Sequence, residues 1–94
     1  MVAQGVEFDW DDENTRRLAA HKLTRADFEQ IMNNDPLDRD YEMIGDEERF
    51  RSVGLTSGGR LLSVVWTVRK GKLRPVTAFP ASAPDKRAFL ERTR

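Results

Sequence analysis

The chain has 94 residues, of which 38% are hydrophobic and 34% are charged, against a usual charged share of about 25%. This length predicts a single domain, residues 1–94, with a modest core and flexible ends at residues 1–5 and 93–94. The absence of cysteine excludes disulfide scaffolds, thiolate metal sites and cysteine nucleophiles, and one histidine disfavours a histidine-rich metal site. The longest apolar stretch, residues 61–66, is short and contains Ser63, so we expect a cytoplasmic protein without a transmembrane helix or signal peptide.

The N-terminal third of the chain predicts one strand and two helices. Residues 6–10 alternate apolar and acidic side chains, which is typical of a half-buried strand. Residues 11–13 are acidic and suit the positive end of a helix dipole, and the helix they open ends near His21. A second helix is predicted after Thr24, because Thr24 and Asp27 have the spacing of a capping box. The side chains it is expected to bury are Phe28, Ile31 and Met32.

The rest of the chain predicts four extended segments and a final helix. The extended segments are residues 37–44, 48–56, 60–69 and 72–79. The third of them has apolar side chains on both faces and is expected to be central in the sheet. Pro75 lacks an N–H group, which predicts an edge or a bulge for the last strand. Residues 82–85 form a capping pattern that opens the final helix.

The predicted order is therefore β-α-α-β-β-β-β-α. Strands joined by short turns form an antiparallel meander, and we expect the helices to gather on one of its faces. The predicted fold class is an α+β two-layer sandwich.

Basic residues are concentrated in the second half of the chain. The net charge is zero, but residues 1–47 hold thirteen acidic and five basic side chains, whereas residues 48–94 hold three and eleven. Guanidinium groups on the predicted strands can bind phosphate oxygens and stabilise charge that develops during cleavage. Alternatively, the charges protect exposed strands from aggregation, or the two halves attract each other. The basic side chains on these strands and turns are Arg49, Arg51, Arg69, Lys70, Lys72 and Arg74.

Three further side chains are candidates for proton transfer. A free histidine side chain can donate or accept a proton near neutral pH, which makes His21 a candidate, and a carboxylate beside arginines, at Glu47 or Glu48, is expected to act as a base. The structural alternatives are a histidine that stabilises a helix end and an ordinary ion pair at a turn. We predict neither a metal nor a cofactor. The carboxylates of Asp38–Asp40 or Asp9–Asp12 are the alternative metal ligands, but the acidic run at residues 11–13 already suits a helix start. Trp10, Trp66 and Phe79 can stack on bases, although core packing is the favoured interpretation of Trp66.

In order and spacing, several short motifs are similar to those of a known family. The sequence resembles the BrnT-type ribonuclease toxins of bacterial type II toxin–antitoxin systems. The similarity covers roughly residues 6–92. The segments that carry it are Phe8–Asp11, Asn14, His21, Leu23–Phe28, Glu48–Arg49, Arg51–Leu55, Gly59–Thr67, Arg74–Ala78 and Asp85–Arg92.

This resemblance implies a RelE-like fold, metal-independent RNA cleavage by attack of the 2′-hydroxyl, and inhibition by a ribbon-helix-helix antitoxin. It implies that Arg49 and Arg74 hold the phosphate and that His21 or Glu48 transfers the proton. The RNA-binding residues it favours are Arg51, Arg69, Lys70 and Lys72. A basic pair of the family is replaced here by Phe79 and Pro80. The alternative is therefore an attenuated relative that binds RNA, or a protein, without cutting.

Overall fold

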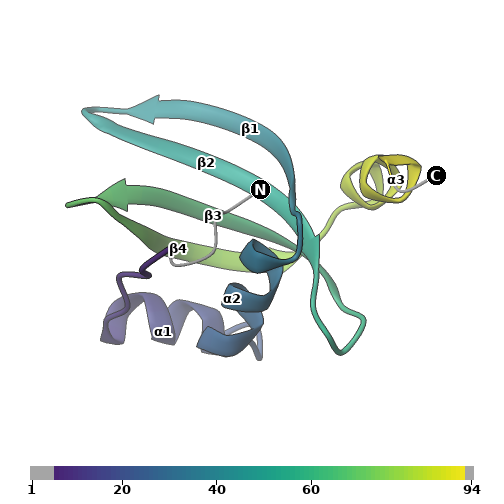
Figure 1. The fold of residues 1–94 in the computed structure, drawn as a ribbon, viewed down its shortest axis with the longest axis horizontal. Coiled ribbons are helices and arrows are strands. Elements are labelled where there is room, and N and C mark those ends of the chain that lie inside the picture. Colours follow the sequence, from purple (N-terminus) through teal and green to yellow (C-terminus); the bar gives the residue numbers. More distant parts are fainter. Residues whose placement is uncertain (1–5, 93–94) are drawn as a thin grey trace.

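The structure, a computed structural model, describes residues 6–92, so the ends expected to be flexible, 1–5 and 93–94, lie outside the described residues. Two helices, four strands and a third helix follow one another along the chain (Figure 1). Their bounds are α1 Asp12–Ala19, α2 Arg25–Asn33, β1 Leu37–Ile44, β2 Glu47–Leu55, β3 Leu61–Arg69, β4 Lys72–Pro80 and α3 Ala83–Arg92. The observed order is α-α-β-β-β-β-α.

The predicted first strand, residues 6–10, is wrong. Within it only Phe8 forms a bridge, which is parallel and pairs with Leu73 of β4. The bridge does not extend because Asp11 already caps α1, so the chain leaves the edge of β4 after one pair. The alternating pattern reflects burial and not strand pairing, since Val6, Phe8 and Trp10 are half-buried against the core.

The four strands form one antiparallel sheet in the order β1-β2-β3-β4, which confirms the predicted meander. As its two apolar faces predicted, β3 is central and pairs with a strand on either side. Strand β4 is an edge strand, and its register shifts where Trp66 pairs with Pro75. Pro75 therefore lies on an edge beside a bulge, as its missing N–H group predicted.

Both N-terminal helices begin at capping boxes. The Asp11 carboxylate accepts a hydrogen bond from the Asn14 N–H group at 2.9 Å, and the Asn14 side chain accepts one from the Asp11 N–H group at 3.0 Å. Thr24 and Asp27 make the same exchange, which confirms the predicted start of α2. In the described part of the chain, no helix is long and apolar enough to cross a membrane.

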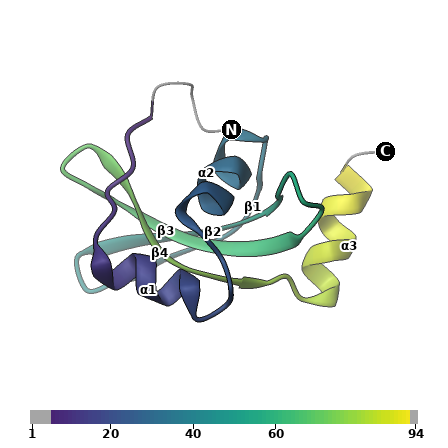
Figure 2. The same ribbon diagram turned by 90° about the horizontal axis from the view of Figure 1, so that it is seen from below.

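The helices do not all lie on one face of the sheet, so that part of the prediction is wrong. Helices α1 and α2 cover the face that carries Leu62 and Val64, and the main core forms between them (Figures 1 and 2). We call this the α1/α2 face. Helix α3 packs on the opposite face, here called the α3 face, where Phe89 contacts a cluster with Val53 and Leu61. This cluster is an apolar strip that α1 and α2 cannot reach. Packing α3 against it removes the apolar surface from water, which stabilises the fold.

Candidate functional site

Arginine side chains gather on the α3 face, at the end of the sheet that α3 does not cover. Arg49 of β2, Arg69 of β3 and Arg74 of β4 come from three neighbouring strands, and alternation along each strand points them to the same face. They border a polar pocket of about 140 Å³. Its lining residues are Glu13, Arg17, Glu47, Arg49, Thr67, Arg69, Arg74, Pro75 and Val76. We call it the arginine pocket.

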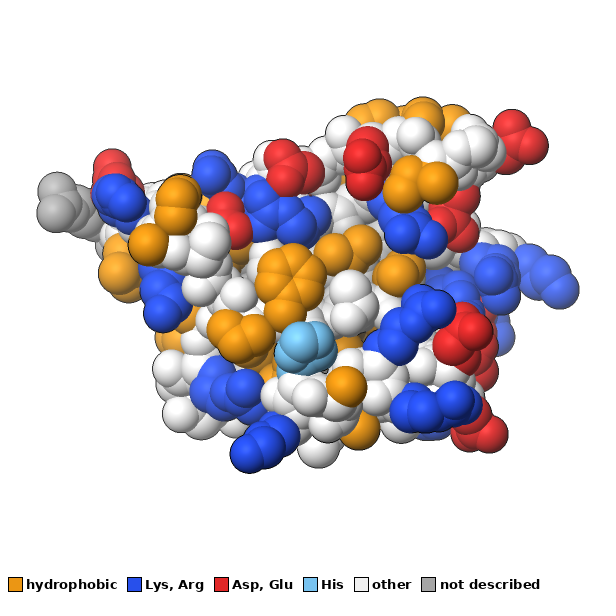
Figure 3. Space-filling model, turned by 180° about the vertical axis from the view of Figure 1, so that it is seen from behind, with side chains coloured by type: hydrophobic (Ala, Val, Ile, Leu, Met, Phe, Trp, Pro, Cys, Tyr) orange, Lys and Arg blue, Asp and Glu red, His pale blue; other side chains and the backbone are white. Residues whose placement is uncertain are grey.

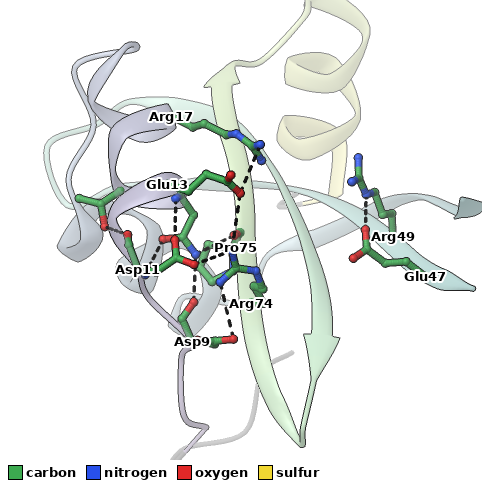
Figure 4. Close-up of polar contacts among 10 residues, drawn as sticks. Asp9, Asp11, Glu13, Arg17, Glu47, Arg49, Arg74 and Pro75 are labelled. Atoms are coloured by element: carbon green, nitrogen blue, oxygen red, sulfur yellow. Dashed lines mark hydrogen bonds and ion pairs between the residues drawn. The ribbon is translucent and has the colours of Figure 1, made fainter.

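Arg74 is the buried member of the pocket, with only 8% of its surface exposed. Its guanidinium lies 2.7 Å from the Asp11 carboxylate, 3.6 Å from that of Asp9 and 3.8 Å from that of Glu13 (Figure 4). The pKa of Asp11 lies below its ordinary value, because the Asn14 N–H group and Arg74 both donate hydrogen bonds to it. Arg74 thus fixes the start of α1 to β4, and its charge is already balanced by carboxylates.

Arg49 and Arg17 are more accessible than Arg74, and each has one carboxylate partner. The Arg49 guanidinium lies 2.7 Å from Glu47, and both side chains are about one-third exposed, at 35% and 37% (Figure 4). Arg17 lies 3.4 Å from Glu13, one turn earlier on α1. Both carboxylates therefore line the pocket together with the arginines.

Arg69 differs from the other arginines of the pocket. It is exposed, and among residues 6–92 it takes part in no ion pair. Guanidinium groups donate paired hydrogen bonds to phosphate oxygens, and several of them around one polar hollow stabilise the negative charge on those oxygens. A carboxylate beside them can accept a proton. The arginine pocket thus combines anion-binding groups with two carboxylates that can accept a proton, Glu13 and Glu47.

A comparison with models of protein families identifies the family of this chain. The family model described as "Ribonuclease toxin, BrnT, of type II toxin-antitoxin system" matches residues 10–85, a range that contains every residue lining the pocket. The chain belongs to the BrnT family. This confirms the resemblance found in the sequence. Membership in a family of type II ribonuclease toxins implies an RNA substrate and an antitoxin partner. None of the curated proteins compared with the chain matches it.

The two residues that the resemblance favours for proton transfer lie outside the arginine pocket. His21 is exposed in the turn after α1, where its carbonyl accepts a hydrogen bond from Arg60 (Figure 3, pale blue). Glu48 is the neighbour of Glu47 on β2 and therefore points to the other face of the sheet. There it accepts a hydrogen bond from the Tyr41 hydroxyl at 2.8 Å.

Three of the predicted RNA-binding residues also lie outside the pocket. Arg51 shares the α3 face with Arg49, but its guanidinium donates to Asp40, Ser63 and Asp85 near the start of α3. Lys70 lies in the turn between β3 and β4, and Lys72 forms a 3.7 Å ion pair with Glu7. The structure thus brings Arg49, Arg69 and Arg74 together and leaves the other basic candidates elsewhere.

Sequence reasoning missed two residues of the pocket and left a third undecided. Glu13 and Arg17 were not singled out, although their spacing of four residues on a helix is a recognisable ion-pair signal. Nothing in the sequence shows that α1 lies along β4, which is what carries this pair to the arginines of the sheet. The sequence did not distinguish Glu47 from Glu48. In the structure, side chains alternate along β2, so the two carboxylates point to opposite faces of the sheet.

Among the described residues, no group of three or more histidine, cysteine or acidic side chains is arranged to hold a metal ion. Three acidic side chains that lie close together, Asp9, Asp11 and Glu13, surround the Arg74 guanidinium (Figure 4).

Proposed function

We propose that the chain is the toxin of a type II system and acts in the cytoplasm as a metal-independent endoribonuclease, with the arginine pocket as its active site. The observation that carries this proposal is the convergence of Arg17, Arg49 and Arg69 with two carboxylates on one polar hollow. Family membership supplies the RNA substrate, and the pocket supplies groups suited to a phosphodiester. The ribbon-helix-helix class of the antitoxin and the RelE-like classification of the fold belong to the same proposal.

The proposed reaction breaks one phosphodiester bond and needs no co-reactant. The 2′-oxygen loses its proton and attacks the adjacent phosphorus, while the bond to the 5′-oxygen of the next nucleotide breaks. The leaving oxygen takes up a proton, so the products carry a 2′,3′-cyclic phosphate and a 5′-hydroxyl. The protein must therefore accept a proton and stabilise the extra negative charge on the phosphate oxygens.

We assign the proton acceptor to Glu47, ahead of Glu48 and His21. The Glu47 carboxylate lies in the pocket, 2.7 Å from the Arg49 guanidinium that would hold the phosphate. Arg49 and Arg69 are assigned to the phosphate oxygens because their guanidinium groups border the pocket and are not buried. Arg74 is a positioning residue in this scheme, since its side chain is buried and its guanidinium is paired with Asp11 at 2.7 Å.

The proposal is tested by incubating a defined RNA with the purified protein in excess EDTA. We expect cleavage to 2′,3′-cyclic phosphate ends, and a rate that falls about 100- to 1,000-fold in Arg49→Ala, the typical cost of losing one transition-state donor. The matched control is Arg16→Ala on α1, because Arg16 is exposed and does not line the pocket. Equal cleavage by wild type and Arg49→Ala would remove the pocket from the mechanism.

The alternative, an attenuated relative that binds RNA without cutting it, comes from the Phe79–Pro80 replacement. Neither residue lines the arginine pocket, and Phe79 pairs with Ser63 further along the sheet. The replacement therefore leaves the proposed active site intact. Salt-sensitive RNA binding with intact RNA recovered from the EDTA assay would favour the attenuated relative instead.

A further inference from the structure

The α1/α2 face has an exposed apolar region at the end of the sheet where β1 turns into β2. The hairpin of these two strands reaches beyond α2 in Figure 1. Tyr41 and Met43 of β1 and Val68 of β3 are 54%, 55% and 57% exposed, which is unusual for three large apolar side chains on one surface of so charged a chain.

These side chains belong to a regular array of two rows across three strands. In the first row, the rings of Tyr41 and Phe50 lie 5.2 Å apart and those of Phe50 and Trp66 lie 4.4 Å apart and stacked. The second row lies two positions away on each strand, toward the β1–β2 turn, and contains Met43, Glu48 and Val68, with Met43 paired to Glu48. We call these six residues the aromatic platform.

Hydrogen bonds fix the polar ends of the aromatic platform. The Trp66 indole N–H group donates to the Ser52 hydroxyl at 3.1 Å, and this hydroxyl donates to the Asp38 carboxylate at 2.9 Å. The Tyr41 hydroxyl donates to Glu48, which raises the pKa of Tyr41. The rings are therefore held in place before any partner arrives, which lowers the entropic cost of binding.

The charged groups that hydrogen-bond to the aromatic platform, directly or through Ser52, are acidic, whereas the nearby Arg39 is paired with Asp85. In the part of the chain that the structure describes, neither Asp38 nor Glu48 forms an ion pair with a basic side chain. A polyanion such as RNA is repelled by these carboxylates, so the rings are not suited to stacking on nucleotide bases. A protein segment with apolar and basic side chains is attracted to the same surface.

A hollow beside the aromatic platform fits a long basic side chain. It has a volume of about 370 Å³ and lies at the bulge of β1. Of the charged side chains that line it, Asp40 is paired with Arg51 and Arg39 with Asp85, so the Asp38 carboxylate is the one left to receive a basic group. An ammonium or guanidinium group there would reach a carboxylate and lie near an aromatic face. Its lining residues are Asp38, Arg39, Asp40, Tyr41 and Phe50.

We propose that the aromatic platform is the docking surface of the antitoxin, which binds it through an apolar segment that places a lysine or arginine in the hollow. The inference rests on the toxin–antitoxin part of the proposed function and not on RNA cleavage. The platform and the arginine pocket lie on opposite faces of the same strands, so the two partners recognise different surfaces of the chain.

The test measures binding of the cognate antitoxin to three folded variants. Met43→Lys and Val68→Lys each place a positive charge on an exposed position of the platform, and we expect at least about a 30-fold weaker affinity, the size of a binding hot spot. Ile44→Lys is the matched control. Ile44 is the next residue on β1, is 46% exposed and points to the other face, so the antitoxin affinity should not change.

The outcomes separate this inference from the proposed function. Loss of antitoxin binding in both platform variants, with wild-type binding in Ile44→Lys, supports the docking surface even if the chain cuts no RNA. Wild-type binding in Met43→Lys and Val68→Lys, or an equal loss in Ile44→Lys, would overturn it even if RNA is cut. A self-association of the free chain that Met43→Lys abolishes, or a loss of RNA binding in that variant, would also overturn it by assigning the platform to another occupant.

Discussion

The two faces of strand β2 show how different the chemistry on either side of one sheet is. On the α3 face, Glu47 and Arg49 border a polar pocket with basic side chains from three other elements. On the α1/α2 face, Glu48 and Phe50 belong to an array of rings and exposed apolar side chains with unpaired carboxylates. Residues adjacent in the sequence therefore contribute to two surfaces of opposite charge. One strand can serve two partners because its side chains alternate.

The largest effect we predict is on the rate of RNA cleavage, when the carboxylate of Glu47 or of its neighbour Glu48 is replaced by an amide. Glu47→Gln removes the proposed proton acceptor and should lower the rate of RNA cleavage about 100- to 10,000-fold, the usual range for a general base. Glu48→Gln, on the other face, should leave that rate within about twofold and weaken antitoxin binding instead. Single-turnover cleavage of a defined RNA measures both variants, and the reverse pattern would return the proton acceptor to Glu48.

The second prediction concerns the network that holds α3 on its face. The Asp85 side chain is 7% exposed and accepts hydrogen bonds from both Arg39 and Arg51. Asp85→Ala leaves two partly exposed guanidinium groups without this partner, although Arg51 keeps Asp40, and should lower the free energy of unfolding by about 1.5–3 kcal/mol. Urea denaturation followed by circular dichroism measures the change. A loss below about 1 kcal/mol would show that water replaces the carboxylate at little cost.

The same carboxylate predicts how stability depends on pH. Burial opposes ionisation of Asp85, but the hydrogen bonds from Arg51 and Arg39 outweigh it, and its pKa lies below the ordinary 3.8. A carboxyl group whose pKa is lower in the folded state stabilises the fold at pH values above its unfolded pKa, and this contribution disappears as the pH falls through the folded pKa. Stability should therefore decline below about pH 4, and Asp85→Asn should show a shallower decline than wild type. Equal slopes in acid titrations followed by circular dichroism would contradict this assignment.

A smaller loss of stability is expected where α2 crosses the sheet. Gly54 lies under Ile31, and a Cβ atom at position 54 would be 2.5 Å from the Ile31 Cγ2 atom. Gly54→Ala should cost about 1–3 kcal/mol of unfolding free energy because the core must shift to admit the methyl group. Gly58→Ala is the control, since a Cβ atom there meets only the Thr56 hydroxyl at 3.8 Å. Thermal denaturation of both variants makes the comparison.

The smallest predicted effect separates two neighbouring arginines on α1. Arg17 lines the arginine pocket and Arg16 does not, although both are exposed. If Arg17 meets an RNA phosphate, Arg17→Ala should reduce the slope of log affinity against log salt concentration by about 0.7, whereas Arg16→Ala should not change it. Fluorescence anisotropy with a labelled single-stranded RNA measures the slopes, and equal slopes in the two variants would exclude this phosphate contact.

Much of the fold could be predicted because its signals are local. The capping residues Thr24 and Asp27 lie three positions apart, and the edge position of Pro75 follows from its missing N–H group. The two errors concern contacts between distant segments. Residues 6–10 alternate like a strand but pair only once, at the edge of β4, and Phe89 packs on a face that only the folded sheet defines.

The candidate site was less predictable for the same reason. Arg49 and Arg69 were identified by residue type, and the structure brings both to one pocket. The burial of Arg74 depends on carboxylates about sixty residues earlier in the chain, which no local pattern links to it. Which of Glu47 and Glu48 faces the pocket depends on the register of β2 against β1, which the turn before β2 sets. A shift of one residue would exchange their faces.

The most direct test of the account is a reciprocal measurement on two variants, Arg49→Ala and Met43→Lys, each assayed for RNA cleavage in EDTA and for antitoxin binding. The account predicts that Arg49→Ala loses cleavage and keeps antitoxin binding, whereas Met43→Lys keeps cleavage and loses antitoxin binding. Loss of both activities in either folded variant, or of neither activity in both, would contradict the claim that the two faces of the sheet serve different partners.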